Sequence, residues 1–239
     1  MKRALVTGGS GAIGAALCRK LAADGHHIYV HANTGTERAQ AVAAEIAAAG
    51  GSAQAAIFDV TDFAATGAAL QRLLGSGAIQ IVINNAGIHD DAVMPGMSRA
   101  QWSRVIDVSL NGFFNVTQPL LMPMIQTRWG RIVSVSSVAA LAGNRGQVNY
   151  AAAKAGLHGA SRALALELAS RGITVNVVAP GIIQSPMSEG AFSKEQIDRL
   201  VPMKRAGTPD EVAELVSFLA SEHAAYVTAQ IISINGGLI

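Results

Sequence analysis

The sequence has little of what several classes of protein need. Cys18 is the only cysteine, so no intrachain disulfide can form, and its place in a predicted helix suggests ordinary core packing. Aromatic residues make up 5% of the chain and the formal net charge is +2, which does not favour nucleic-acid binding. No Cys/His cluster suggests a metal site, and no uninterrupted apolar run approaches the roughly 18 residues that span a bilayer. These absences favour a globular catalytic domain.

The length and the N-terminus indicate how the chain is organised. Its 239 residues, half of them hydrophobic, are enough to bury one large core. Met1, Lys2 and Arg3 resemble the start of a signal peptide, but glycines soon interrupt the apolar segment and no small-residue cleavage site follows. We therefore expect a single domain over 1–239 in an unprocessed cytoplasmic protein.

Short β-branched runs alternate with alanine-rich stretches along the whole chain. This alternation predicts strands near 3–7, 27–32, 53–58, 79–84, 130–136, 173–178 and 230–234, and helices near 12–24, 36–49, 62–74, 98–126, 149–170 and 209–220. Continuous apolar strands such as 79–83 are typical of a parallel sheet covered on both faces. We expect an α/β fold: a single-domain Rossmann fold whose doubly wound, seven-stranded parallel sheet has helices on both faces.

A glycine-rich turn follows the first expected strand. Residues 2–6 read as a short buried strand, and Thr7 to Gly14 form the turn before a helix that ends near Asp24 and Gly25. Glycines let the backbone approach a pyrophosphate, and the N-terminal amides of the helix point at its negative charge. The order of strand, glycine turn and helix therefore predicts a dinucleotide site.

The second candidate site joins three polar residues. Tyr150 and Lys154 are four residues apart in an alanine-rich run, and Ser137 lies thirteen residues before Tyr150. In a helix, positions i and i+4 share a face, so the ammonium would lie near the phenol and favour its ionised form. Such a pair also occurs on helix surfaces with no chemistry. The glycine turn favours the catalytic interpretation, with Ser137 holding a substrate oxygen.

These motifs together resemble the short-chain dehydrogenase/reductase family, and within it the 3-oxoacyl-acyl-carrier-protein reductases. The resemblance covers essentially all 239 residues. It depends on motifs in the family's order: Thr7 to Gly14, Asp59-Val60, Asn84 to Gly87, Ser137, Tyr150 to Lys154, Asn176 to Gly181 and Asn235 to Gly237. Several spaced motifs are more specific than any one of them, since Asn84 to Gly87 alone is also typical of a turn.

The resemblance implies a reaction and a set of contacts. Hydride would pass from the nicotinamide to a carbonyl carbon while Tyr150 gives its oxygen a proton; Ser137 would hold that oxygen, and Lys154 would bind the nicotinamide ribose. The implied cofactor contacts are Gly8, Ser10, Gly11, Ala12, Ile13, Gly14, Asn33, Thr34, Asp59, Val60, Asn85, Ala86, Gly87, Tyr150, Lys154, Pro180, Gly181 and Ile183.

Two positions depart from the family pattern. Ala12 stands where the glycine turn usually has a third glycine, and Gly11 beside it keeps the backbone permissive. Ser109 stands where the family commonly has a catalytic Asn, which steadies a helix bend whose carbonyl holds a water leading to Lys154. Because the main-chain carbonyl survives the change to Ser, we expect the rate to fall modestly if at all. Asn111 lies on a different face and should not inherit the role.

The end of the second strand indicates the cofactor. Relatives that prefer NAD place a carboxylate there, whereas this chain has Ala32. Asn33, Thr34, Thr36 and Arg38 offer donors and a charge to a 2′-phosphate instead, so NADPH is the expected cofactor. Gly11 replaces a basic residue of many NADP-dependent relatives, and His31 is interpreted as a packing residue.

The substrate and partners are implied by the resemblance alone. Arg128 and Arg171 match positions that would dock an acidic acyl-carrier protein, although both also suit ordinary helix ends. Residues 182–208 are expected to form a substrate-covering lid, and a homotetramer of the family kind is expected. Lid side chains that could cover an acyl chain, or pack a mobile helix, are Met187, Phe192, Ile197, Leu200 and Met203.

Three functions remain open. The first is an NADPH-dependent reductase of 3-oxoacyl thioesters on a carrier protein, in fatty-acid or polyene/polyketide synthesis. The second is an acetoacetyl-CoA reductase or another dehydrogenase of the fold, acting on a free alcohol, sugar or acyl-CoA. The third is a nucleotide-binding subunit without turnover, which Ala12 and Ser109 alone support and the intact Ser137, Tyr150 and Lys154 oppose.

Overall fold

The computed structural model describes residues 1–185 and 192–239. Within them, seven parallel strands form one sheet in the order β3-β2-β1-β4-β5-β6-β7. The strand order changes direction between β1 and β4, as in doubly wound sheets. The predicted fold class is confirmed. The strands are β1 (Arg3–Val6), β2 (His27–Ala32), β3 (Ser52–Ile57), β4 (Ile81–Asn84), β5 (Gly130–Val135), β6 (Ile173–Pro180) and β7 (Ile231–Ile234).

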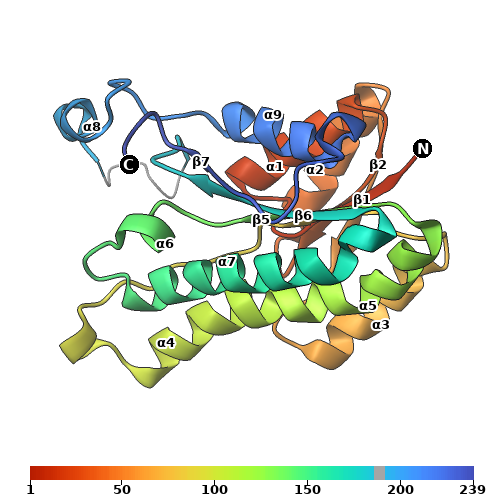
Figure 1. The fold of residues 1–239 in the computed structure, drawn as a ribbon, viewed down its shortest axis with the longest axis horizontal. Coiled ribbons are helices and arrows are strands. Elements are labelled where there is room, and N and C mark those ends of the chain that lie inside the picture. The colour runs from red at the N-terminus through yellow and green to blue at the C-terminus, as the bar shows by residue number, and fades with distance from the viewer. Residues whose placement is uncertain (186–191) are drawn as a thin grey trace.

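Helices cover both faces of this sheet (Figure 1), and each face has its own apolar core. One core packs α1, α2 and α9 on the sheet, and the other packs α3, α5 and α7. Each fully buried aliphatic side chain contributes about 1.5–3 kcal/mol to the free energy of unfolding. The helices are α1 (Ala12–Ala23), α2 (Thr36–Ala48), α3 (Phe63–Leu74), α4 (Arg99–Ile106), α5 (Gly112–Thr127), α6 (Ala139–Ala142), α7 (Val148–Leu168), α8 (Lys194–Leu200) and α9 (Pro209–Ala220).

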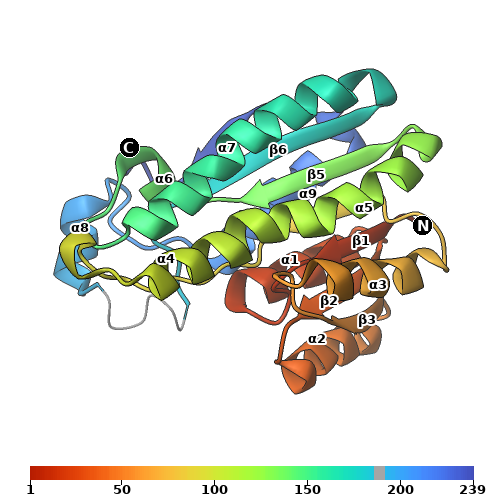
Figure 2. The ribbon, with the colours of Figure 1, turned by 90° about the horizontal axis from the view of Figure 1, so that it is seen from below.

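The helix expected over 98–126 contains a π-helical segment in the structure. A capping box of Ser98 and Gln101 starts α4, and a π-helical segment, Asp107–Asn111, joins α4 to α5. A π-turn accommodates one extra residue and changes the direction of the side chains that follow. Figure 2 shows α4 and α5 running as one long rod beside α7. The expected bend at Ser109 is therefore an insertion within a continuous helical rod.

The expected lid, 182–208, is described in part. Ile183 forms a bridge with Gly207, and Ser193 caps α8 by accepting a hydrogen bond from the Gln196 amide. Met187 lies outside the described residues, as do its neighbours over 186–191. In residues 1–185 and 192–239, no helix is both long and apolar enough to cross a bilayer.

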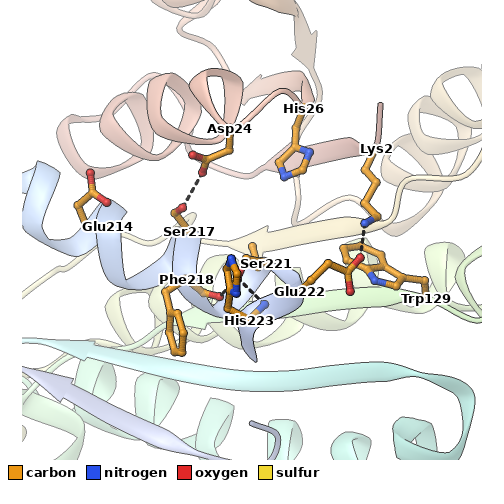
Figure 3. Close-up of a pocket in the computed structure, with 11 residues that line it drawn as sticks. Lys2, Asp24, His26, Trp129, Glu214, Ser217, Phe218, Ser221, Glu222 and His223 are labelled. Carbon is orange, nitrogen blue, oxygen red and sulfur yellow. Dashed lines mark hydrogen bonds and ion pairs between the residues drawn. The ribbon is translucent and has the colours of Figure 1, made fainter. Parts of the chain in front are cut away.

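A hollow of about 510 Å³ lies at the amino end of the sheet, where residues preceding the parallel strands meet (Figure 3). Its charged groups already have partners: Lys2 Nζ lies 2.7 Å from Glu222 Oε1 and 3.7 Å from the centre of the Trp129 ring. Across the hollow, Ser217 donates to Asp24 at 2.6 Å. The opposite end of the sheet, reached by the carboxyl ends of the strands, is where doubly wound folds bind ligands.

Candidate active site

Four neighbouring strands bring the predicted site residues together at the carboxyl end of the sheet. The strands β1, β4, β5 and β6 are adjacent and parallel, and they end at Val6, Asn84, Val135 and Pro180. The segments that follow them begin with the glycine turn, Asn85, Ser136 and Gly181. Parallel topology therefore places residues from four distant parts of the sequence at the edge of the sheet where doubly wound folds have their binding crevice.

The glycine turn is shaped to admit a pyrophosphate. Gly8 has φ +63°, a left-handed conformation that side chains rarely adopt. A Cβ on Gly14 would collide with the carbonyl of Gly8, so the first turn of α1 packs directly on the loop. Gly11 occupies the N-cap and has no side chain to accept the first amides of α1. This cradle fits the dinucleotide phosphates that the sequence predicts.

Asn85 and Thr7 lock the glycine turn to the end of β4. Asn85 Nδ2 donates to the carbonyls of Thr7 at 2.9 Å and Gly8 at 3.2 Å. Thr7 Oγ1 accepts from the amides of Asn85 and Ala86 at 2.9 and 3.0 Å. Sequence reasoning did not single out Thr7, although a polar residue directly after a buried strand is the signal that could have found it.

Ser137, Tyr150 and Lys154 converge beside this turn. The Ser137 side chain hydrogen-bonds the Tyr150 phenol, and its Oγ accepts from the Ala139 amide at 3.2 Å. Lys154 is buried; its Nζ lies 5.9 Å from the centre of the Tyr150 ring and donates to the Val135 carbonyl at 2.9 Å. The three side chains therefore form one polar cluster with a hydroxyl pair and a buried cation.

The pKa of Tyr150 is raised in this structure, so the lower net pKa expected from the nearby Lys154 is not found. Burial raises the pKa of Tyr150, Asp91 adds to the increase, and the hydrogen bond from Ser137 opposes it. Burial also lowers the pKa of Lys154 to about 8. The physical reason is that both groups lose hydration on burial, while the ammonium donates to the Val135 carbonyl.

Three further residues hold the catalytic helix α7 in place. Asn149 Oδ1 accepts from the Tyr150 amide at 2.8 Å, and its Nδ2 donates to the Asp90 carbonyl at 3.0 Å. Ser136 Oγ donates to the Lys154 carbonyl at 3.1 Å and lies 2.7 Å from His158 Nε2. Sequence reasoning missed these contacts; His158 lies one helical turn after Lys154, which is the only local signal for it.

Ser109 and Gly87 approach Lys154 from the other side. A Cβ on Gly87 would lie 2.9 Å from Lys154 Nζ and 3.5 Å from Ser109 Oγ. Ser109 is buried in the π-helical segment, and its Oγ has no hydrogen-bond partner in 1–185 and 192–239. Asn111 instead donates to Asp107 Oδ1 at 2.7 Å on the exposed face. Ser109 is thus a neighbour of the cluster and Asn111 is not.

Comparison with known proteins decides the family. A family model described as "short chain dehydrogenase" matches residues 2–196. The chain belongs to the short-chain dehydrogenase family. Its resemblance to that family, expected from the motifs, is confirmed, and membership makes the protein an oxidoreductase that uses a nicotinamide cofactor.

Curated relatives of this dehydrogenase align along nearly its whole length. A "3-oxoacyl-[acyl-carrier-protein] reductase FabG" of Aggregatibacter actinomycetemcomitans is 45% identical, over 98% of each chain. A "Nodulation protein G" of Azospirillum brasilense is 43% identical over 99% of this chain and 98% of its own. An "Acetoacetyl-CoA reductase" of Cupriavidus necator is 41% identical over 98% of this chain and 97% of its own.

Other predicted cofactor contacts of the dehydrogenase surround the same crevice. Asp59 Oδ1 accepts from the amide and hydroxyl of Thr61, both at 2.8 Å, and these bonds lower the pKa of Asp59. Val60 is buried and its carbonyl accepts from Asn115 Nδ2 at 2.8 Å. The Gly181 amide donates to Ile234, which fixes the segment between Pro180 and Ile183.

Asn33 and Thr34 are exposed beyond the end of β2. Next to them, a Cβ on Gly35 would lie 3.2 Å from the Arg38 guanidinium and 3.5 Å from Ser10 Oγ. A cation and a hydroxyl therefore meet above the glycine turn. The remaining predicted contacts, Ala12 and Ile13, form the first turn of α1.

The predicted docking residues lie away from this crevice. Arg128 precedes β5 and Arg171 precedes β6, so both are at the amino end of the sheet, opposite Tyr150 in the same chain. Arg128 has φ +49° and its guanidinium donates to the Ser170 carbonyl at 3.3 Å. The fold thus separates these two cations from the catalytic cluster of the same chain.

Proposed function

We propose that this dehydrogenase reduces a 3-oxoacyl thioester to the 3-hydroxyacyl thioester, with NADPH as its cofactor. The observation that carries the proposal is the cluster of Ser137, Tyr150 and Lys154 beside the glycine turn. Full-length identity of 45% to a 3-oxoacyl-acyl-carrier-protein reductase supports this substrate class. We also propose that residues 1–239 act as one domain.

The site residues have distinct roles in this reaction. When bound, the nicotinamide supplies the hydride that the carbonyl carbon receives. Ser137 and Tyr150 hold the carbonyl oxygen between two hydroxyls, and Tyr150 gives that oxygen its proton, so the ketone becomes an alcohol. The raised pKa of Tyr150 keeps the phenol protonated before this step. Lys154, whose pKa is about 8, stabilises the phenolate that the proton leaves behind.

The choice of NADPH is supported by Arg38 and Ser10. Their side chains meet over Gly35, and β2 ends in Ala32, which has no carboxylate to repel a 2′-phosphate. Arg38→Ala should raise the KM for NADPH about tenfold and leave the KM for NADH unchanged. Arg72→Ala, on α3, is the matched control and should change neither. Equal effects on both cofactors would remove Arg38 from the discrimination.

A carrier protein is the proposed form of the substrate, and Arg128 and Arg171 are its proposed docking residues. Because both lie opposite Tyr150, docking there would serve the site of a neighbouring protomer, which requires the proposed homotetramer. An apolar surface on α3, α5 and α7 supports such an assembly: Phe63 and Phe114 stack at 6.3 Å although both are more than half exposed, and Leu166 is 81% exposed.

The described part of the lid supports a substrate cover next to the crevice. Its helix α8 follows Ser193, and Phe192, Leu200 and Met203 are exposed apolar side chains around it. Ile183 and Gly207 join the two ends of the segment. We propose that Phe192, Leu200 and Met203 cover the acyl chain.

A coenzyme A thioester is the second candidate substrate. The separation of Arg128 and Arg171 from Tyr150 favours it, as does 41% identity to an acetoacetyl-CoA reductase. Initial rates of NADPH oxidation with acetoacetyl-acyl-carrier protein and with acetoacetyl-CoA test both. Faster turnover on the carrier supports the carrier-protein substrate, provided that charge reversal of Arg128 and Arg171 raises the KM for it. Equal rates support the second, and no turnover on either contradicts the proposed function.

A further inference from the structure

Two successive amides of the glycine turn donate to a single residue of β2. The Gly9 amide donates to the His31 carbonyl at 2.8 Å, and the Gly8 amide donates to His31 Nδ1 at 3.1 Å. Gly8 has φ +63°, so the bond from its amide to His31 Nδ1 holds the turn at its left-handed residue. His31 is 2% exposed, as a packing residue should be, yet it holds the turn through directed bonds.

The other ring nitrogen of His31 reaches a different loop. His31 Nε2 lies 2.9 Å from the Phe58 carbonyl, and the two rings are 4.2 Å apart. A carbonyl can only accept, so Nε2 carries the proton and Nδ1 presents a lone pair to Gly8. Since β2 lies between β1 and β3, the imidazole bridges the segments that follow both of these strands.

We propose that His31 is a positioning residue for the dinucleotide, acting as a neutral bridge between the glycine turn and the loop that carries Asp59 and Val60. The first loop is the proposed pyrophosphate cradle and the second carries two of the predicted cofactor contacts, so the inference rests on the proposed function. One rigid ring sets the distance between the walls before the cofactor arrives. This lowers the cost of ordering them on binding.

The surroundings keep the imidazole neutral. Burial lowers the pKa of His31 to about 4, against the Phe58 hydrogen bond and the charge of Asp59, which both favour the cation. The strand β3 has no titratable side chain, and Arg3 of β1 pairs in register with His27 at the far end of β2. A protonated ring would turn an N–H toward the Gly8 amide, which is why the neutral form fits.

Three variants separate the two bonds. His31→Leu removes both, His31→Asn offers an acceptor near Nδ1, and His31→Gln offers a donor near Nε2. Calorimetric titration with NADP⁺ should show the dissociation constant raised about 10- to 50-fold by His31→Leu, and by only a few-fold in His31→Asn. At saturating NADPH, kcat of all three should stay within about twofold of the unmodified enzyme, so the effect falls on KM.

His27→Leu is the matched control, because it removes the other imidazole of β2, which is partly buried and lies 2.7 Å from Ser52 Oγ. It should lower the melting temperature without changing the dissociation constant. Equal NADP⁺ affinity in His31→Leu and the unmodified protein, or equal weakening by His27→Leu, would overturn the inference. Failure of the unmodified protein to bind NADP⁺ would contradict the proposed function instead. Nitrogen-15 NMR of His31 should show a proton on Nε2 alone at pH 6; a proton on Nδ1 would also overturn it.

Discussion

The two ends of the sheet are built on opposite principles. At the amino end, charged groups pair with one another: Glu222 Oε1 lies 2.7 Å from Lys2 Nζ, and Glu222 Oε2 lies 3.5 Å from the buried Arg131 guanidinium. At the carboxyl end, within residues 1–185 and 192–239, the buried Lys154 has no carboxylate partner and Ser109 Oγ has no hydrogen-bond partner. The hollow of about 510 Å³ lies at the amino end, so the presence of a hollow alone does not locate the chemistry.

The polar groups therefore have different roles at the two ends of the sheet. Charges that are already paired with each other leave little for a ligand to gain. Groups that are desolvated and incompletely paired have shifted pKa values and interact strongly with whatever enters. Variants at the carboxyl end should therefore change activity or cofactor binding, and variants at the amino end should change only stability.

The largest expected effect is at the proton donor. Tyr150→Phe removes the phenolic proton and should lower kcat about 10³-fold, since a general acid contributes roughly 10²–10⁴-fold. The dissociation constant for NADP⁺ and the melting temperature should stay near those of the unmodified protein. Tyr226→Phe, at a fully exposed tyrosine, is the control and should leave the initial rate unchanged. Comparable rates in Tyr150→Phe and the control would exclude this assignment.

The next effect is on the glycine turn. Gly14→Ala places a Cβ against the Gly8 carbonyl, so it should weaken NADP⁺ binding by about 100-fold, measured by calorimetry. Gly159→Ala is the matched control within α7, where a Cβ would meet no described atom within 4 Å. It should bind normally and raise the melting temperature slightly, because Ala favours helix over Gly. Normal binding by Gly14→Ala would show that phosphates bind elsewhere.

Acid should weaken the fold through His31. Its pKa falls from 6.5 unfolded to about 4 folded, so the native state binds fewer protons between these values. This contribution to stability is present above pH 6.5 and is lost as the pH falls toward 4, by about 3 kcal/mol in all. Urea titrations at pH 7 and 4.5 should show a smaller loss in His31→Asn. An equal loss in both proteins would contradict a neutral buried ring.

The smallest effect belongs to the amino end. Glu222→Gln removes the anion near Lys2 and Arg131 and should lower the free energy of unfolding by at most about 1 kcal/mol, because Glu222 itself is largely exposed. The value of kcat should not change. A lower kcat in Glu222→Gln with an unchanged free energy of unfolding would contradict the separation of stability and activity between the two ends.

Local patterns predicted much of this molecule. The glycine turn, the i, i+4 spacing of Tyr150 and Lys154, and the alternation of strands and helices are all encoded within short windows of sequence. The contacts that were missed join distant residues: Thr7 with Asn85, or His31 with Gly8 and Phe58. Only the strand order brings them together.

The direction of the Tyr150 pKa shift could not be predicted from spacing. Four residues of helix place Lys154 near Tyr150, but spacing does not reveal that the ammonium turns to the Val135 carbonyl or how far both groups lose water. The π-helical segment at Ser109 was equally hidden, because one extra residue in a helix leaves the apolar pattern almost unchanged.

Hydrogen–deuterium exchange with and without NADP⁺ tests the division between the two ends most directly. Amides of the glycine turn and of 85–87 should gain protection when NADP⁺ is added, while those of 128–131 and 221–225 should exchange at unchanged rates. Protection concentrated around Trp129 and Glu222, with none at the glycine turn, would place the cofactor at the amino end and contradict the account.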